Sequence, residues 1–257
     1  MKVNTRKERE KLFHEQAFAT GTRRSVRRLY SELTMIRTFL MDRLTAYGRG
    51  KRVLEYGCGS GELAVYLASN DAYVTGIDLS ERAIQMAEER AGYESEKDRI
   101  SFQVMDAENM TFPAGSFDLV YGTGVLHHLD LDRALSETCR VLSTRGIAIF
   151  AEPLGHNPFI NLFRKLTPRL RTTDEHPLLK KDLVKIESYF REIDFFYFYL
   201  FSMLAVPFCR FPGFRWLIHG LELFDKFLFS LIPWIRMQAW QIVMILSEPK
   251  LLSSEKD

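Results

Sequence analysis

The sequence contains little cysteine: Cys58, Cys139 and Cys209 are the three in 257 residues. Because their number is odd and their spacings are wide, a disulfide framework is excluded as the basis of the fold. None of the spacings matches a metal-ligand motif, so we expect no bound metal. Thiols of this kind are typical of a reducing compartment, which predicts a cytoplasmic protein.

The sequence also lacks an apolar run long enough to cross a bilayer. The longest uncharged apolar stretch runs from Phe195 to Cys209 and contains Pro207, whereas a spanning helix needs about 20 residues. The charged N-terminus has no apolar segment and does not resemble a secretory signal. We therefore expect a protein that is soluble or bound at a membrane surface.

Charge is nearly balanced over the whole chain but not along it. The net charge is +2, yet residues 1–52 contain 14 Lys or Arg against 5 Asp or Glu. A basic N-terminal arm indicates an anionic partner, such as phosphate or a membrane surface, or simply a solvated helical face. Both interpretations stay open.

Hydrophobic periodicity predicts an α/β fold in a single domain. Helices are expected over 6–20 and 22–47; the second has arginines at helical spacing and an apolar stripe, namely Arg23, Arg24, Arg27 and Arg28 with Leu29, Leu33, Ile36, Phe39, Leu40 and Leu44. Strands are expected at 52–55, 73–78, 100–105, 117–121, 146–151, 193–200 and 240–246, and further helices at 62–69, 81–91, 130–141 and 181–190. Such alternation implies right-handed crossovers and a parallel sheet. The domain (1–257) then has an N-terminal helical cap (1–50), a cofactor-binding core (51–152) and two inserts on the acceptor side (153–180 and 203–236).

A glycine-rich turn follows the first predicted strand. The strand ends in Glu55 and runs into Gly57, Gly59 and Gly61, which open a helix. Glycines there let a ligand approach the backbone and leave N–H groups free at the helix N-terminus. The dinucleotide fingerprint places its third glycine three residues after the second, but here the interval is two. A pyrophosphate gains nothing from Glu55, whereas an ammonium group does, so the turn favours S-adenosyl-L-methionine.

The ends of the next strands agree with this cofactor. Asp78, followed by Leu79, ends the second strand about twenty residues after the glycines, where a carboxylate suits a ribose diol. Asp106, followed by Ala107, ends the third strand and can accept a hydrogen bond from an adenine amino group. Gly122 ends the fourth strand, which is expected to run into the cofactor crevice. Helix capping is the alternative role for either aspartate.

Together these motifs resemble those of class I S-adenosylmethionine-dependent methyltransferases, in the small-molecule group related to ubiquinone and menaquinone methyltransferases. The resemblance covers roughly residues 50–152 and includes Phe-Asp-Leu-Val at 117–120 and Leu-His-His-Leu at 126–129. Residues 143–146 depart from the family's Pro-Gly-Gly pattern, which affects the turn before the fifth strand. The resemblance implies a sheet of order 3-2-1-4-5-7-6, with the last strand antiparallel, and a cofactor at the carboxyl ends of strands one to four.

Candidate bases lie at the ends of the fourth and fifth strands. Methyl transfer from a sulfonium is an in-line displacement, for which a protein supplies position and, where needed, a base. His127 and His128 follow the fourth strand and Glu152 ends the fifth; imidazole suits proton transfer near neutral pH. In the family that these motifs resemble, some members use such a histidine or acid to deprotonate a hydroxyl group. Packing is the alternative for His128, and His156 and His176 are expected to be ordinary loop residues.

The insert at 203–236 is rich in aromatic residues: Phe208, Phe211, Phe214, Trp216, Phe224, Phe227, Phe229 and Trp234. Because Pro207, Pro212 and Pro233 interrupt it, we expect short helices joined by bends. Exposed apolar area of this size indicates the wall of an apolar acceptor pocket, a membrane-facing patch or a homodimer surface; packing against the N-terminal helices is the alternative. The basic arm and the insert together fit a peripheral membrane enzyme.

Three functions remain open on the sequence. The first is methylation of a small, apolar acceptor; the second is RNA-directed methylation, favoured by the basic arm; the third is non-catalytic binding of S-adenosylmethionine. No Asn/Asp-Pro-Pro-Tyr/Phe tetrad follows the fourth strand, where residues 121–124 read Tyr-Gly-Thr-Gly, and this disfavours nucleic acid. The intact cofactor motifs disfavour the third. Neither the acceptor nor the methylated atom is specified.

Overall fold

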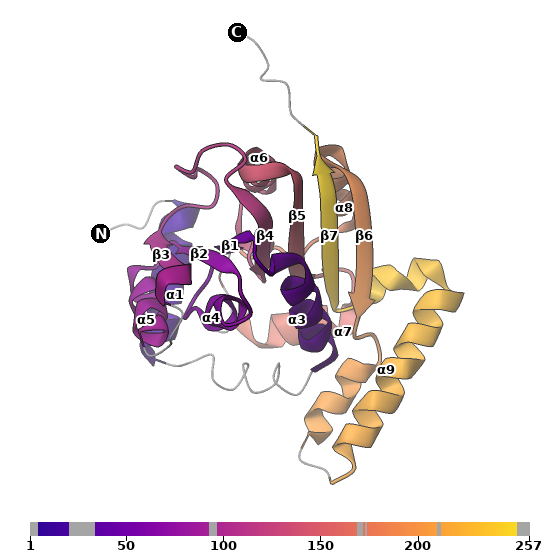
Figure 1. Cartoon of the computed structure of the whole chain (residues 1–257). Helices are drawn as coiled ribbons and strands as arrows, with labels where there is room; N and C mark the ends of the chain where they lie inside the picture. Colours follow the sequence, from indigo (N-terminus) through magenta and orange to yellow (C-terminus); the bar gives the residue numbers. More distant parts are fainter. Residues whose placement is uncertain are drawn as a thin grey trace.

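The fold is built on one seven-stranded sheet (Figure 1). The computed structural model describes residues 5–20, 34–92, 97–168, 172, 174–209 and 212–250. The strands are β1 (Arg52–Tyr56), β2 (Tyr73–Asp78), β3 (Ile100–Val104), β4 (Phe117–Thr123), β5 (Leu142–Pro153), β6 (Phe190–Phe198) and β7 (Gln241–Pro249). Their order is β3-β2-β1-β4-β5-β7-β6, and β7 runs antiparallel to both of its neighbours. The predicted strand order and direction are thus confirmed.

Helices cover both faces of the sheet. They are α1 (Arg6–Thr20), α3 (Thr34–Gly48), α4 (Glu62–Ala68), α5 (Glu81–Ala91), α6 (Leu131–Val141), α7 (Pro158–Leu166), α8 (Lys180–Tyr189) and α9 (Phe214–Leu231), with short 3-10 helices η1 (Lys97–Arg99), η2 (Leu126–His128), η4 (Ser202–Phe208) and η5 (Pro233–Gln238). Leu44 of α3 and Leu67 of α4 belong to the core on one face. Leu135 of α6 and Ile186 of α8 belong to the core on the other. The sheet is therefore buried on both sides, as its apolar strands require.

Several predicted segments differ from the structure by one to three residues at their ends, and the start of β5 differs by four. Of the predicted helix over 22–47, only 34–48 is described, as α3; the arginines and leucines of 23–33 lie outside the described residues, as does Phe211. β5 begins at Leu142, not at 146. Its pairing shifts from Phe117–Leu142 to Leu119–Ile147, so β5 advances five residues while β4 advances two. The expected turn at 143–146 is thus an irregularity within the strand.

The aromatic insert contains one long helix, so the expectation of short helices only was wrong. α9 has 18 residues between Pro212 and Pro233; because the prolines lie outside it, no N–H is missing from its interior. Asp225 of α9 accepts hydrogen bonds from the amides of Leu200, Phe201 and Ser202 at 2.8, 2.8 and 3.0 Å. This buried carboxylate joins the insert to the end of β6.

The parallel strands all end at the edge of the sheet where α7 and α9 lie (Figure 1). The connection from β1 leads to β2, and the connection from the neighbouring β4 leads the other way to β5; ligands bind at such switch points. Among the helices of the described residues, none is both long and apolar enough to cross a membrane.

Candidate cofactor and catalytic site

The turn after β1 has the backbone conformation that its glycines predict. Gly57, Gly59 and Gly61 have φ of 61°, 53° and 70°, a region that strains any residue with a Cβ. At Gly61 a Cβ would also lie 2.8 Å from the Phe102 ring and 2.9 Å from Ala87. The turn is therefore left-handed at three alternate positions, and its last glycine lets α5 and β3 pack against the start of α4.

Asp78 at the end of β2 holds this turn in place. Its Oδ2 accepts a hydrogen bond from the Gly59 amide at 3.0 Å, and its Oδ1 accepts one from the Ser80 amide at 2.9 Å. The side chain is half-buried, as is Leu79. Since each carboxylate oxygen has two lone pairs, Asp78 can order the turn and still accept hydrogen bonds from a diol. The ribose assignment stays a prediction that this geometry permits.

Glu55 lies below the turn and not on its surface. It is 4% exposed, opposite Tyr121 in the β1–β4 register. Burial raises the pKa of its carboxyl to about 8, although Tyr121 and the Ala64 backbone beside it act in the opposite direction. At neutral pH the group is therefore protonated, and binding an ammonium group would require its ionisation. The predicted ammonium contact stays a prediction.

The raised pKa of Glu55 predicts a pH-dependent stability. In the unfolded chain this carboxyl ionises near its ordinary pKa of 4.5, whereas in the folded protein it keeps its proton up to about pH 8. Its contribution to stability is complete below pH 4.5 and is lost as the pH rises toward 8. We expect Glu55→Gln to unfold with a free energy roughly 4 kcal/mol above that of the parent at pH 7.5, and with no difference near pH 4. Urea denaturation of both proteins across this pH range, without cofactor, measures the two free energies of unfolding. If these free energies change equally with pH, the raised pKa of Glu55 is contradicted.

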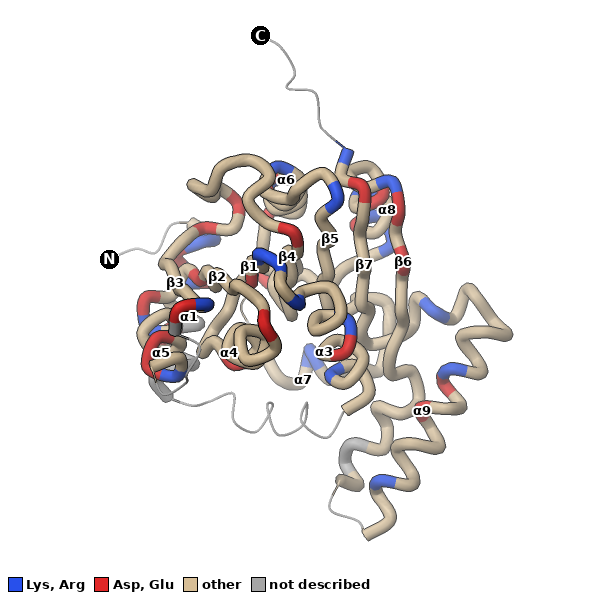
Figure 2. Tube along the Cα trace, in the orientation of Figure 1, with Lys and Arg blue, Asp and Glu red and all other residues tan. Residues whose placement is uncertain are grey.

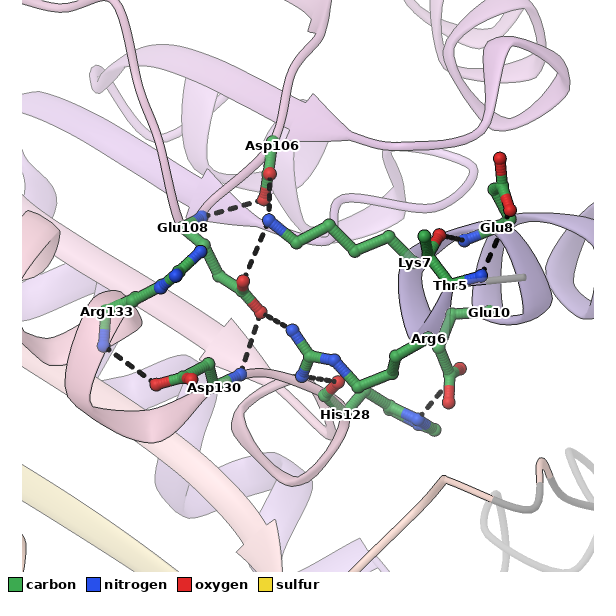
Figure 3. A network of polar contacts seen from close by, with 10 residues as sticks. All are labelled: Thr5, Arg6, Lys7, Glu8, Glu10, Asp106, Glu108, His128, Asp130 and Arg133. Carbon is green, nitrogen blue, oxygen red and sulfur yellow. Dashed lines mark hydrogen bonds and ion pairs between the residues drawn. The ribbon is translucent and has the colours of Figure 1, made fainter. Parts of the chain in front are cut away.

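The acidic groups after β3 are covered by α1 (Figure 3). Lys7 Nζ lies 2.5 Å from Asp106 Oδ2 and 2.8 Å from Glu108 Oε2, and Arg6 donates to Glu108. Burial alone would raise the pKa of Glu108, but hydrogen bonds from Lys7, the Asp130 amide and Arg6 lower it below its ordinary value. Asp106 Oδ1 accepts a hydrogen bond from the Glu108 amide at 2.9 Å. The neighbouring Ala107 is buried. The predicted hydrogen bond between Asp106 and the adenine amino group stays a prediction.

The contacts of α1 were not predicted from the sequence. The excess of Lys and Arg before residue 52 was the one available signal, and it was consistent with an external anion or with a solvated helical face. In the structure Arg6, Lys7 and Arg9 pair with carboxylates of the chain itself, Arg9 with Asp174 at 2.7 Å. No motif marks these pairs because their partners are about a hundred residues or more away along the chain.

The predicted catalytic residues His127 and Glu152 are in direct contact. Glu152, 1% exposed, accepts from the amides of Val125 and Leu126 at 2.9 and 2.8 Å through Oε1. Its Oε2 lies 2.7 Å from His127 Nδ1. A carboxylate beside Nδ1 favours a proton there and leaves Nε2 as the acceptor. Gly122, at the end of β4, makes room for this loop, because a Cβ there would lie 2.5 Å from Val125.

His128 lies beside this pair, with the ring centroids of the two histidines 4.1 Å apart. Its Nδ1 is 3.1 Å from Glu10 Oε2 of α1 (Figure 3). Glu175, from the loop before α8, approaches His127 Nε2 to 3.9 Å. Atoms of His127, His128 and Glu175 that could ligate a metal lie within 4.8 Å of one another, so these three side chains are the group that could hold a cation at this site. The expectation of no metal stays a prediction.

The two remaining histidines near β5 have structural contacts. His156 Nε2 accepts from the Lys180 amide at 3.0 Å, and His176 Nε2 lies 3.7 Å from Asp182. Neither is joined to Glu152 by a described interaction, and their role as ordinary loop residues stays a prediction.

Comparison with known proteins agrees with the site. Residues 54–150 match the family described as methyltransferase domain. The chain is 39% identical over 114 residues to 27-O-demethylrifamycin SV methyltransferase of Amycolatopsis mediterranei, an alignment that covers 42% of each chain. It is 34% identical over 109 residues to ubiquinone biosynthesis O-methyltransferase of Coxiella burnetii, covering 42% of this chain and 46% of that one. The matches thus span less than half the length of these curated relatives.

Solved structures share the fold at low identity. Phosphoethanolamine N-methyltransferase 2 of Haemonchus contortus, in complex with S-adenosyl-L-methionine, has a TM-score of 0.56 at 20% identity, covering 80% of this chain and 51% of that one. Geranyl diphosphate C-methyltransferase of Streptomyces coelicolor has a TM-score of 0.57 at 14% identity, covering 86% and 83%. Residues 54–150 of the chain thus match a methyltransferase domain family, and the chain shares the fold of these solved methyltransferases.

Proposed function

We propose that this protein transfers a methyl group from S-adenosyl-L-methionine to a hydroxyl group of a small, apolar acceptor. The observation that carries the proposal is that one edge of the sheet holds both the left-handed glycine turn, ordered by Asp78, and the His127–Glu152 pair. The glycine turn is suited to binding the cofactor, and the His127–Glu152 pair is suited to accepting a proton. An oxygen acceptor is supported by the two curated relatives, whose names describe O-methylation.

The residues divide the chemistry as follows. S-Adenosylmethionine, when bound, supplies the methyl group on its sulfonium. His127 Nε2 accepts the hydroxyl proton of the acceptor while the new C–O bond forms and the C–S bond breaks, and S-adenosylhomocysteine leaves. Glu152 keeps the imidazole in the required tautomer and stabilises its protonated form. The buried amides of Val125 and Leu126 hold Glu152 itself in place.

An apolar acceptor is supported by the aromatic insert. A groove of about 310 Å³ between η4 and α9 is lined wholly by apolar side chains, among them Phe201, Leu204, Phe208 and Phe224. Apolar grooves of this kind bind apolar parts of ligands. RNA is less well supported, because the described cations Arg6, Lys7 and Arg9 already pair with carboxylates of this chain. A membrane-facing patch and a homodimer surface are the remaining alternatives for the groove.

The test is cofactor binding followed by transfer. Calorimetry should detect S-adenosylmethionine and S-adenosylhomocysteine. Radiolabelled methyl groups should then appear in solvent-extractable products from a panel of phenols and hydroquinones, and not in RNA. Binding without transfer to any small acceptor, or label in RNA, would contradict the proposal.

A further inference from the structure

Helix α9 has several large apolar residues on its exposed side and both of its carboxylates on its buried side. A surface helix normally turns apolar residues inward and charged residues outward. In α9 both carboxylates, Glu222 and Asp225, are buried. Its outer side carries six large apolar residues instead, all among the exposed hydrophobics: Trp216, Leu217, Leu223, Phe224, Phe227 and Leu231. This arrangement matches a helix whose outer side meets an apolar phase.

The exposed side chains include those that favour a bilayer interface. Trp216 is 84% exposed, and Trp234 of the following η5 is 76% exposed. Tryptophan concentrates at the boundary between headgroups and acyl chains. The start of α7 lies beside η5, because Asn157 at the N-cap of α7 donates to the Gln238 carbonyl at the end of η5 at 2.7 Å. Phe159, Leu162, Phe163 and Leu166 of α7 are also exposed.

The charge of this surface is positive. Residues 212–238 contain Glu222 and Asp225 as their only carboxylates, and these face inward, whereas Arg215 and Lys226 are exposed. α7 has no carboxylate and carries Arg164 and Lys165 in its last turn. Figure 2 shows α9 as a mostly tan trace with a few isolated basic and acidic segments. Cations around an apolar surface strengthen binding to anionic lipids and would weaken its self-association by like-charge repulsion.

We propose that α7, α9 and η5 form a docking surface for an anionic lipid bilayer. The aromatic side chains enter the interface, and Arg215, Lys226 and Lys165 lie at the level of the phosphates. The edge of the sheet with the cofactor turn and His127 is also the edge where α7 and α9 lie (Figure 1). An apolar acceptor dissolved in the membrane would therefore be within reach of His127. This consequence, and not the docking itself, rests on the proposed function.

The test is co-sedimentation of the full chain, without cofactor or acceptor, with vesicles of phosphatidylcholine alone or mixed with phosphatidylglycerol. We expect binding to the mixed vesicles and at least tenfold weaker binding to the neutral ones. The double variant Trp216→Ser/Trp234→Ser should bind the mixed vesicles at least tenfold more weakly. Arg215→Gln/Lys226→Gln should lose the preference for the mixed vesicles. The matched controls are Tyr73→Ser, which removes a half-exposed aromatic ring at the amino end of β2, and Arg49→Gln, and both should bind as the parent does.

Three results would overturn the inference. One is no sedimentation with either vesicle. Another is equal binding by the Trp216→Ser/Trp234→Ser and Tyr73→Ser variants. A third is a concentration-dependent dimer in analytical ultracentrifugation that the tryptophan substitutions dissociate, since a second copy would then occupy the surface. Calorimetry with S-adenosylmethionine on the same variants should give unchanged affinity, so failure of docking and failure of the proposed methyl transfer are read separately.

Discussion

Replacing Asp78 by alanine is expected to lower the affinity for S-adenosylmethionine by more than 10²-fold while leaving the protein folded. Two effects add. The ribose loses its charged acceptor, and each hydrogen bond to a charged group contributes about 1.5–3 kcal/mol. The amides of Gly59 and Ser80 also lose the carboxylate that orders the glycine turn. Calorimetry measures the affinity and circular dichroism the fold.

Two further variants separate these effects. Asp78→Asn keeps one carbonyl oxygen for the Gly59 amide but has no charge, so we expect an intermediate loss of affinity. Asp118→Asn is the matched control: Asp118 lies on β4 and pairs with Arg52 at the opposite edge of the sheet. It should bind the cofactor as the parent does. If Asp78→Ala folds and keeps its affinity, the ribose assignment is wrong.

The second large effect is expected at His127. We expect His127→Ala to lower kcat by about 10²-fold or more, with little change in the dissociation constant of S-adenosylmethionine, because general-base catalysis contributes 10²–10⁴-fold. Glu152→Gln should have a similar effect without removing the imidazole. If its oxygen keeps the amides of Val125 and Leu126, its NH₂ faces His127 Nδ1. The ring would then be protonated at Nε2 and could not accept the acceptor's proton.

The measurements that distinguish catalysis from packing are the separate values of kcat and KM and the pH profile of kcat/KM. His128→Gln tests the neighbouring ring, which lies against Glu10 of α1. His219→Gln, on the exposed side of α9, is the control and should behave as the parent. Near-normal turnover in the variants of His127, His128 and Glu152 would show that positioning alone suffices, and would contradict the assignment of a base.

The sequence alone determined the strands and the cofactor turn. Apolar periodicity and the residues at strand ends are local properties, so the order of elements and the places of Asp78, Asp106 and Glu152 followed from them. The three glycines indicated a left-handed turn because few other residues adopt a positive φ there. The α/β alternation and the family's motifs then predicted the strand order that the structure has.

Only the tertiary structure decided which of these groups meet. The 2.7 Å contact between His127 and Glu152 joins two strand ends, and the pairs of Arg6 and Lys7 with Glu108 join α1 to the loop after β3. The sequence suggested an ammonium contact for Glu55, but burial of this residue raises the pKa of its carboxyl to about 8. The sequence also could not show that α9 turns Glu222 and Asp225 inward and Trp216 outward. The reason is physical: pairing and burial depend on which distant segments exclude water from a side chain, and local periodicity carries no information about them.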